Sequence, residues 1–164
     1  MTRAVISLGS NIGDRMAHLT SAVAAFGPAV RAVSSVYRTP PWGPVPQDDY
    51  YNMVLIVDDG AVDAGGWLER CLAVERAQDR ERNQRWGPRT LDADVITVDD
   101  ERITPGDDPG PDLILPHPRA HQRAFVLLPW AEVEPTAELP DHGPIADLLD
   151  GMDTSGIRKV GRVH

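Results

Sequence analysis

The sequence has one cysteine, no long hydrophobic run and a deficit of basic side chains, and each shortage excludes a class of protein. Cys71 stands alone, so no disulfide forms within the chain, and we expect it to be a small buried side chain of a helix. The apolar run at residues 4–8 is too short for a signal-peptide core or a membrane span. Acidic residues outnumber basic ones 25 to 16, giving a net charge of −9. We therefore expect a soluble, cytoplasmic protein that binds neither nucleic acid nor membrane.

The common nucleotide-binding motifs are also missing. A turn with two glycines, residues 9–13, joins an expected strand at 4–8 to an expected helix from Asp14 to about Phe26. Its spacing is not that of a P-loop, no lysine follows it, and GxGxxG is absent. We interpret it as a strand-to-helix turn, with contact to an anion as the less favoured alternative.

Hydrophobic periodicity predicts alternating strands and helices in a single domain of residues 1–164. Strands are expected at 30–39, 50–57 and 91–98, with short ones near 102–104 and 113–115. Helices are expected at 67–80, 118–128 and 144–149. In the first of these helices the inward side chains are expected to be Trp67, Leu68, Cys71, Leu72 and Val74. The chain beyond Gly151 shows little periodicity.

Two carboxylates stand two residues apart on the strand at 91–98. Asp92 and Asp94 share one face there, with Cβ atoms roughly 6.5–7 Å apart. Such a pair suits Mg²⁺, which binds through one or two carboxylates plus substrate phosphates. An isolated pair would more simply be a solvated strand face. Here the arginine-rich segment 76–89 leads directly into it, which favours a polyphosphate site.

Other polar residues allow a structural and a functional interpretation. Tyr50 and Asn52 share a face and could bind a planar heterocycle, although on this pattern alone a satisfied buried asparagine is the better interpretation. His117 and His121 have a spacing that suits zinc, but Pro118 leaves His117 outside the helix and no third ligand is evident. A zinc site is therefore disfavoured.

Several motifs together resemble one family. They are YRTPPWGP (37–44), YYN (50–52), RER (80–82), RWGPRTLDAD (85–94), PHP (116–118) and RAF (123–125). In this order they are similar to the 6-hydroxymethyl-7,8-dihydropterin pyrophosphokinases of folate biosynthesis, over residues 4 to about 134. The resemblance implies transfer of pyrophosphate from ATP to the pterin hydroxymethyl group with release of AMP. It also implies an α+β fold, a ferredoxin-like α/β sandwich with a mainly antiparallel sheet and helices packed on it.

The resemblance also implies a role for each matched residue. Asp92 and Asp94 would hold two Mg²⁺ ions bridging the ATP phosphates. The nucleotide or its phosphates would be contacted by Arg80, Arg82, Arg89, His117 and Arg123, with Glu75 nearby, the first three arginines being catalytic. The pterin would stack between Tyr50 and Phe125, with Asn52 and Thr39 at its polar edge. Pro40, Trp42 and Trp86 would complete this site.

Two departures from the family and two rival functions remain. Leu72 stands where many members have glutamine, and the loop from 80 to 86 is one residue shorter than in the longer members. One rival is a Mg²⁺-dependent nucleotidyltransferase that uses the same aspartate pair. The other is a ferredoxin-like RNA-binding module, which the net charge of −9 disfavours. We expect a monomer.

Overall fold

The computed structural model describes residues 2–41, 46–78, 90–104 and 113–163. Within these residues a six-stranded sheet has the order β5-β1-β4-β3-β8, and β2 also pairs with β4. Its strands are β1 (Arg3–Ser10), β2 (Val30–Val33), β3 (Val36–Thr39), β4 (Tyr50–Asp58), β5 (Asp92–Val98) and β8 (Arg158–Gly161). Each of these pairings is antiparallel.

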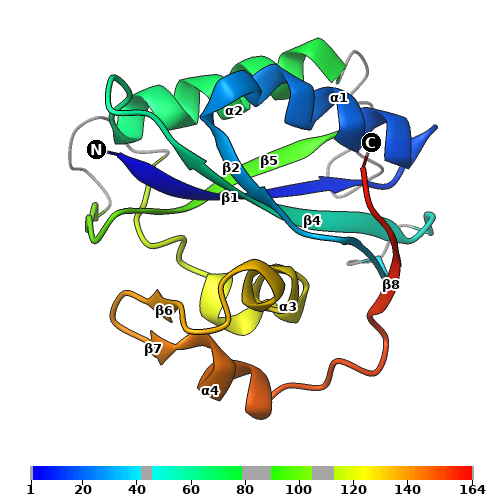
Figure 1. The fold of residues 1–164 in the computed structure, drawn as a ribbon. Helices are drawn as coiled ribbons and strands as arrows, with labels where there is room; N and C mark the ends of the chain where they lie inside the picture. Colours follow the sequence, from blue (N-terminus) through cyan, green and yellow to red (C-terminus); the bar gives the residue numbers. More distant parts are fainter. Residues whose placement is uncertain (1, 42–45, 79–89, 105–112, 164) are drawn as a thin grey trace.

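Helices cover both faces of the sheet (Figure 1). On one face lie α1 (Arg15–Phe26) and α2 (Ala64–Gln78); on the other lie α3 (Ala124–Val133), α4 (Ile145–Asp150) and the small hairpin β6 (Glu138–Leu139) and β7 (Gly143–Pro144). Two 3₁₀ turns, η1 (Gly27–Ala29) and η2 (Ala120–Gln122), precede β2 and α3. With β2 and β3 taken as one broken strand, this is the ferredoxin-like α+β order that the resemblance implied, so the predicted fold is confirmed.

The first helix has the predicted ends. The Asp14 carboxylate accepts a hydrogen bond from the Ala17 N–H at 3.1 Å, which satisfies one of the free amides at the helix start. Gly27 ends the helix with a φ of +59°, a conformation that glycine adopts without strain.

The predicted strand at 30–39 is wrong as one element, because it breaks at Ser34 and Ser35 into β2 and β3. The Ser34 hydroxyl accepts the Val54 N–H at 2.9 Å, and the Ser35 N–H turns away from β4 to the Glu132 carboxylate at 3.0 Å. The side chains of Ser34 and Glu132 thus replace backbone partners in the hydrogen-bond ladder at this point. The break lets β3 continue along the other half of β4, where Thr39 pairs with Tyr50.

Other element boundaries also differ from prediction. The second long helix begins at Ala64, three residues early, and Leu72 on it is 37 % exposed, so Leu72 does not face inward as expected. The expected helix at 118–128 is the turn η2 followed by α3, and the two short strands shrink to a bridge between Ile103 and Leu115. The tail contributes β8.

The core has two parts, one on each face of the sheet. Alternate residues of β1 divide between them, so that Ile6 packs with α1 and α2 while Val5 packs with α3 and α4. Cys71 is fully buried on the α1–α2 side, where burial and the charges of Asp94 and Glu75 raise the pKa of its thiol. The prediction of a small buried hydrophobe is confirmed.

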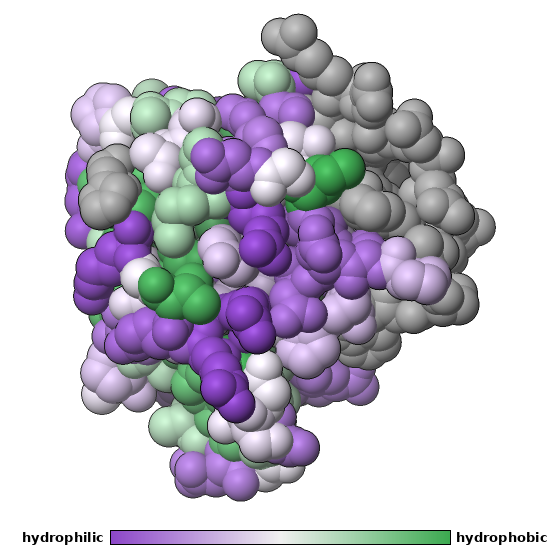
Figure 2. Space-filling model, turned by 90° about the vertical axis from the view of Figure 1, so that its right-hand side faces the viewer, coloured by the Kyte–Doolittle hydropathy of each residue, from purple (hydrophilic) through white to green (hydrophobic). Residues whose placement is uncertain are grey.

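Figure 2 shows one face that is mostly hydrophilic, with small, separate hydrophobic areas. Among the residues that the structure describes, the exposed large hydrophobic side chains are Ile12, Leu72 and Val160, and scattered apolar residues of this kind are ordinary. In the described ranges, no helix has both the length and the apolar composition to cross a membrane.

Candidate active site

Four strands place a row of residues across one end of the sheet. Gly9 of β1 pairs with Asn52 of β4 on one side and with Asp92 of β5 on the other, and Asn52 pairs in turn with Tyr37 of β3. Directly opposed residues of antiparallel strands have side chains on the same face. Val54, two residues beyond Asn52, packs with α3, so the row faces the α3 side.

Gly9 leaves the middle of this row without a side chain. A Cβ atom at this position would lie 2.7 Å from Asn52 Oδ1 and 3.5 Å from Tyr50 Cδ1. The first distance is a clash, so Asn52 keeps its place only beside a glycine. Sequence reasoning assigned Gly9 to a turn and missed this role, although a glycine within a strand often marks such close approach.

Asp92 and Asp94 lie on one face of β5, as predicted. Asp92 pairs with Gly9 and Asp94 with Ser7, two residues apart along β1, and both carboxylates are half-buried. Two hard oxygen donors so placed fit Mg²⁺. Among the described residues no group of three or more His, Cys, Asp or Glu side chains could hold a metal, so such an ion would take its remaining ligands from substrate and water.

His117 lies along the outer edge of β5. Its backbone N–H donates to the Ile96 carbonyl at 2.9 Å, and its Nδ1 accepts the Arg119 N–H at 3.2 Å. The neutral ring therefore carries its proton on Nε2. Burial is the main cause that lowers the pKa of His117, helped by Arg123 and Arg119 and opposed by Asp94.

Arg123 and Phe125 come from the start of α3. The Arg123 guanidinium lies 5.5 Å from the centre of the Phe125 ring. Burial lowers the pKa of Arg123, while the charges of Asp94 and Asp92 act in the opposite direction. Arginine nevertheless stays protonated, so the structure brings a cation to the carboxylate pair from across the sheet face.

Glu75 has a structural contact that the sequence did not indicate. Its Oε2 accepts the Ala93 N–H at 2.9 Å, between the two aspartates in the chain. The carboxylate thus satisfies a strand amide of β5 and joins α2 to the aspartate strand.

The predicted pterin residues at β3 and β4 meet in space. Asn52 is 4 % exposed and its Nδ2 donates to Thr39 Oγ1 at 2.6 Å. Tyr50 shares its face, and Phe125 packs on that same side of the sheet with the core beneath α3. Pro40, which follows Thr39, lies against Gly156 of the C-terminal segment.

Five predicted site residues lie outside the described residues: Arg80, Arg82, Arg89, Trp42 and Trp86. Of the ten that are described, eight lie at this end of the sheet, on the α3 face or at the edge of β5: Asp92, Asp94, His117, Arg123, Phe125, Tyr50, Asn52 and Thr39. Glu75 reaches β5 from α2, on the opposite face. Pro40 follows at the end of β3.

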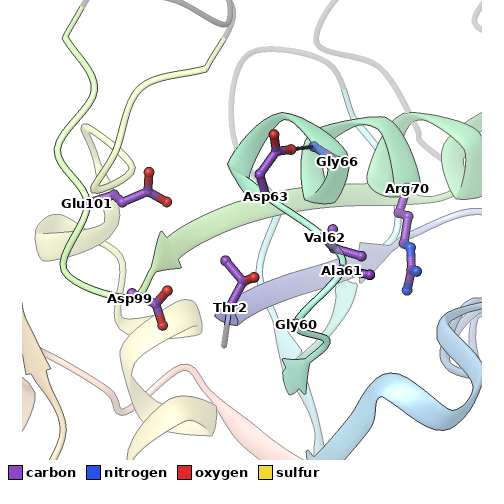
Figure 3. A pocket seen from close by; sticks show the side chains of 9 residues that line it. All are labelled: Thr2, Gly60, Ala61, Val62, Asp63, Gly66, Arg70, Asp99 and Glu101. Carbon is purple, nitrogen blue, oxygen red and sulfur yellow. Dashed lines mark hydrogen bonds between the residues drawn. The ribbon is translucent and has the colours of Figure 1, made fainter.

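A shallow pocket of about 530 Å³ lies elsewhere, at the opposite end of the sheet (Figure 3). Its wall includes Thr2 before β1, Asp99 after β5, Asp63 just before α2 and Arg70 near the middle of α2. None of the ten predicted site residues that the structure describes lines it. Two of its acidic groups have structural partners: Asp63 accepts the Gly66 N–H at 2.8 Å, and Asp99 accepts the Arg3 N–H at 3.0 Å.

Solved structures support the fold. The Plasmodium falciparum HPPK-DHPS wild type superposes with a TM-score of 0.67 at 14 % identity, over 92 % of this chain and 43 % of that one. An HPPK-DHPS in complex with substrates gives a TM-score of 0.68 at 11 % identity, over 91 % and 43 %. The chain thus spans less than half the length of these two-part proteins.

Sequence comparison gives nearer relatives, each named a 2-amino-4-hydroxy-6-hydroxymethyldihydropteridine pyrophosphokinase. The Mycobacterium tuberculosis protein is 47 % identical over 160 residues, covering 93 % of this chain and 85 % of that protein. The Methylorubrum extorquens protein is 42 % identical over 169 aligned residues, covering 98 % and 99 %. The family model for 7,8-dihydro-6-hydroxymethylpterin-pyrophosphokinase matches residues 5–135. The chain therefore belongs to the 7,8-dihydro-6-hydroxymethylpterin-pyrophosphokinase family.

Proposed function

We propose that this chain uses the row at Gly9 to transfer pyrophosphate from ATP to 6-hydroxymethyl-7,8-dihydropterin, releasing AMP. The family and its named relatives catalyse this transfer in folate biosynthesis, and ATP is the co-substrate. The observation that carries the proposal is the register of Asn52, Gly9 and Asp92, which lie side by side on three adjacent strands. Strands lie about 4.8 Å apart, so a pterin at Asn52 and a polyphosphate at Asp92 would be neighbours across a bare glycine.

Asp92 and Asp94 are the proposed ligands of two Mg²⁺ ions. Bound there, the ions would neutralise charge on the phosphates of ATP and hold them in place. The protein's own contribution is to fix both carboxylates on a strand whose register with β1 is set by backbone pairing.

The hydrogen-bond donors around the aspartates bind the nucleotide in this proposal. Arg123 approaches from α3 and His117 from the edge of β5, where the proton on its Nε2 is available to a phosphate or ribose oxygen. Glu75 reaches the same strand from α2 through its hydrogen bond to Ala93 and has a supporting role near the nucleotide in this proposal. Arg80, Arg82 and Arg89 are proposed to neutralise the transferring group.

The pterin is proposed to lie at β3 and β4, stacked between Tyr50 and Phe125. Asn52 and Thr39 would bind its polar edge, with Pro40, Trp42 and Trp86 completing the site. The hydroxymethyl oxygen then attacks the β-phosphorus of ATP, the bond from that phosphorus to the bridging oxygen of the α-phosphate breaks, and AMP leaves with that oxygen. The hydroxyl proton passes to water or to a nearby aspartate, so no dedicated strong base is required.

Product analysis tests this function against a nucleotidyltransferase. Incubation with Mg²⁺, ATP and 6-hydroxymethyl-7,8-dihydropterin should yield AMP and the pyrophosphorylated pterin in equal amounts. A nucleotidyltransferase would instead release inorganic pyrophosphate and attach AMP to its acceptor. Release of pyrophosphate, or no product at all, would overturn the proposal.

We further infer that residues 1–164 form one pyrophosphokinase domain that acts as a cytoplasmic monomer without nucleic acid. The exposed large apolar residues of the described surface are scattered, which supports the monomer. Light scattering at micromolar concentration should give a mass near 17.9 kDa, and a value twice as large would refute the monomer.

A further inference from the structure

Glu132, in the last turn of α3, collects hydrogen bonds from two distant parts of the chain. Its carboxylate accepts the Ser35 N–H at 3.0 Å, the Ser35 hydroxyl at 2.8 Å and the Tyr37 hydroxyl at 2.6 Å. Arg162, just after β8, donates to the same carboxylate at 3.0 Å. One half-buried side chain therefore joins α3, β3 and the C-terminal strand.

The charge state of this cluster is well defined. Burial alone would raise the pKa of Glu132, but the hydrogen bonds from Tyr37 and Ser35 and the charge of Lys159 lower it below its ordinary value. Burial and the neighbouring Glu132 raise the pKa of Tyr37. Near neutral pH Glu132 is an anion and Tyr37 a donor, which makes their hydrogen bond one of the stronger kind.

The cluster acts on the strand that carries the pterin residues. Tyr37 lies directly opposite Asn52 and two residues before Thr39, and its ring is only 6 % exposed. Asn52 donates to Thr39 and leaves no room for a side chain at Gly9. Its amide is thus held by Thr39 of β3, so a shift of β3 would turn the amide.

The C-terminal segment supports β3 from its outer edge. In β8, Lys159 pairs with Tyr37, and its ammonium lies 5.9 Å from the Tyr37 ring. Arg162 also donates to the Val33 carbonyl at 3.3 Å, on the other side of the strand break. The segment therefore bridges the break at Ser34 and Ser35 and holds its two sides together.

We propose that Glu132, together with Tyr37 and Arg162, is a positioning group for pterin recognition, because it sets the place of β3 and hence the orientation of Asn52 and Thr39. This inference rests on the proposed function. It adds that α3, whose first turn carries Arg123 and Phe125, also aligns the pterin strand through its last turn. A purely structural role for Glu132 is the alternative.

Steady-state kinetics with each substrate varied in turn separate the two roles. For the pterin, KM should rise about tenfold in Glu132→Gln and about fivefold in Tyr37→Phe, in line with the loss of a charged hydrogen bond. The KM for ATP and kcat at saturating pterin should stay within about twofold, because Asp92, Asp94 and Arg123 are untouched. Tyr51→Phe is the matched control, since Tyr51 neighbours Asn52 but packs on the α1 side beneath Arg15.

Arg162 provides a test that does not depend on a buried substitution. Its side chain is 63 % exposed, so its variants should fold even if Glu132→Gln does not. Arg162→Glu places a second carboxylate beside Glu132 and should raise the KM for the pterin about threefold. Arg162→Lys keeps the positive charge, so its KM for the pterin should be that of the unsubstituted enzyme. Arg158→Glu, also on the C-terminal segment, should leave this KM unchanged.

The outcomes distinguish this inference from the proposed function. An unsubstituted enzyme that forms no AMP and pyrophosphorylated pterin overturns both. An active enzyme whose Glu132, Tyr37 and Arg162 variants lose thermal stability but keep its KM for the pterin overturns the positioning role alone. A parallel rise in KM for both substrates also overturns it.

Discussion

The two ends of the central sheet both carry aspartates, but the carboxylates meet different partners. At the end with the pocket, Asp59 accepts the Ala61 N–H at 3.0 Å and Asp99 accepts the Arg3 N–H at 3.0 Å (Figure 3 shows Asp99). At the other end, Asp92 and Asp94 stand on a strand, and the groups that face Asp94 are the Arg123 guanidinium and the His117 ring.

In the proposed function, this difference separates structural from functional carboxylates. An aspartate in a turn is stabilised by a nearby amide, and the pKa of Asp59 is lowered first by its bond to Ala61 and then by Arg70. Two aspartates on one strand face repel each other. In the proposed function, a cation that arrives with the substrate offsets this repulsion.

The largest expected effect is the loss of turnover in Asp92→Asn and Asp94→Asn. The amide keeps the shape but cannot neutralise metal-bound phosphate, so kcat should fall on the order of a hundred- to a thousandfold. The melting temperature without ligand should be unchanged or slightly higher, because a repulsion is removed.

Asp63→Ala is the control at the other end of the sheet. It removes the bond to the Gly66 N–H and should cost about 1 kcal/mol of unfolding free energy with kcat unchanged. If the Asp92 and Asp94 variants melt at a lower temperature than the unsubstituted protein yet turn over normally, these two carboxylates are structural and the functional assignment is wrong.

The second-largest expected effect is that of Gly9→Ala, at the centre of the row formed by Tyr37, Asn52, Gly9 and Asp92. Gly9→Ala puts a methyl group 2.7 Å from Asn52 Oδ1, so Asn52 must turn away. We expect a KM for the pterin at least about tenfold higher and a loss of about 1–3 kcal/mol in unfolding free energy from overpacking.

Gly60→Ala is the matched substitution at the pocket end, where a Cβ atom would have no neighbour within 4 Å. Its stability and kinetics should be those of the unsubstituted enzyme. Equal effects of Gly9→Ala and Gly60→Ala on the KM for the pterin would contradict the claim that Asn52 requires a glycine at position 9.

The smallest effect is a pH dependence of stability at a stacked histidine pair. His121 of η2 and His142 have ring centres 4.0 Å apart, and burial followed by the charge of His142 lowers the pKa of His121. A lowered pKa favours the neutral ring in the folded state, so stability is lost as pH falls below the ordinary value of about 6.5. Thermal melts between pH 7.5 and pH 5 should show this loss, and it should shrink in His142→Gln; an unchanged profile would refute it.

Much of this comparison was predictable from the sequence because it depends on local patterns. Period-two alternation placed Asp92 and Asp94 on one strand face, and Asp14 and the glycine after Phe26 marked the ends of α1. The assignment of Asn52 and Tyr50 to one face followed from the same rule. These features can be predicted from residues that are close to one another in the sequence.

The rest depends on partners far away in the sequence. The break at Ser35 requires Glu132, 97 residues away, and β8 carries exposed Arg158, Lys159 and Val160 in place of an alternating pattern. The importance of Gly9 depends on the side chain of Asn52 across the strand pair. Such features appear only when the register of the sheet is known.

Calorimetric titration with a non-hydrolysable ATP analogue tests the central claim, that Asp92 and Asp94 hold Mg²⁺ with the nucleotide. The account predicts that Mg²⁺ tightens binding to the unsubstituted protein at least about tenfold over binding in EDTA, since charge on the phosphates is neutralised only with the ion. It also predicts that this gain disappears in the Asp92→Asn/Asp94→Asn double variant. Equal binding with and without Mg²⁺, or a gain that survives the double substitution, would contradict the account.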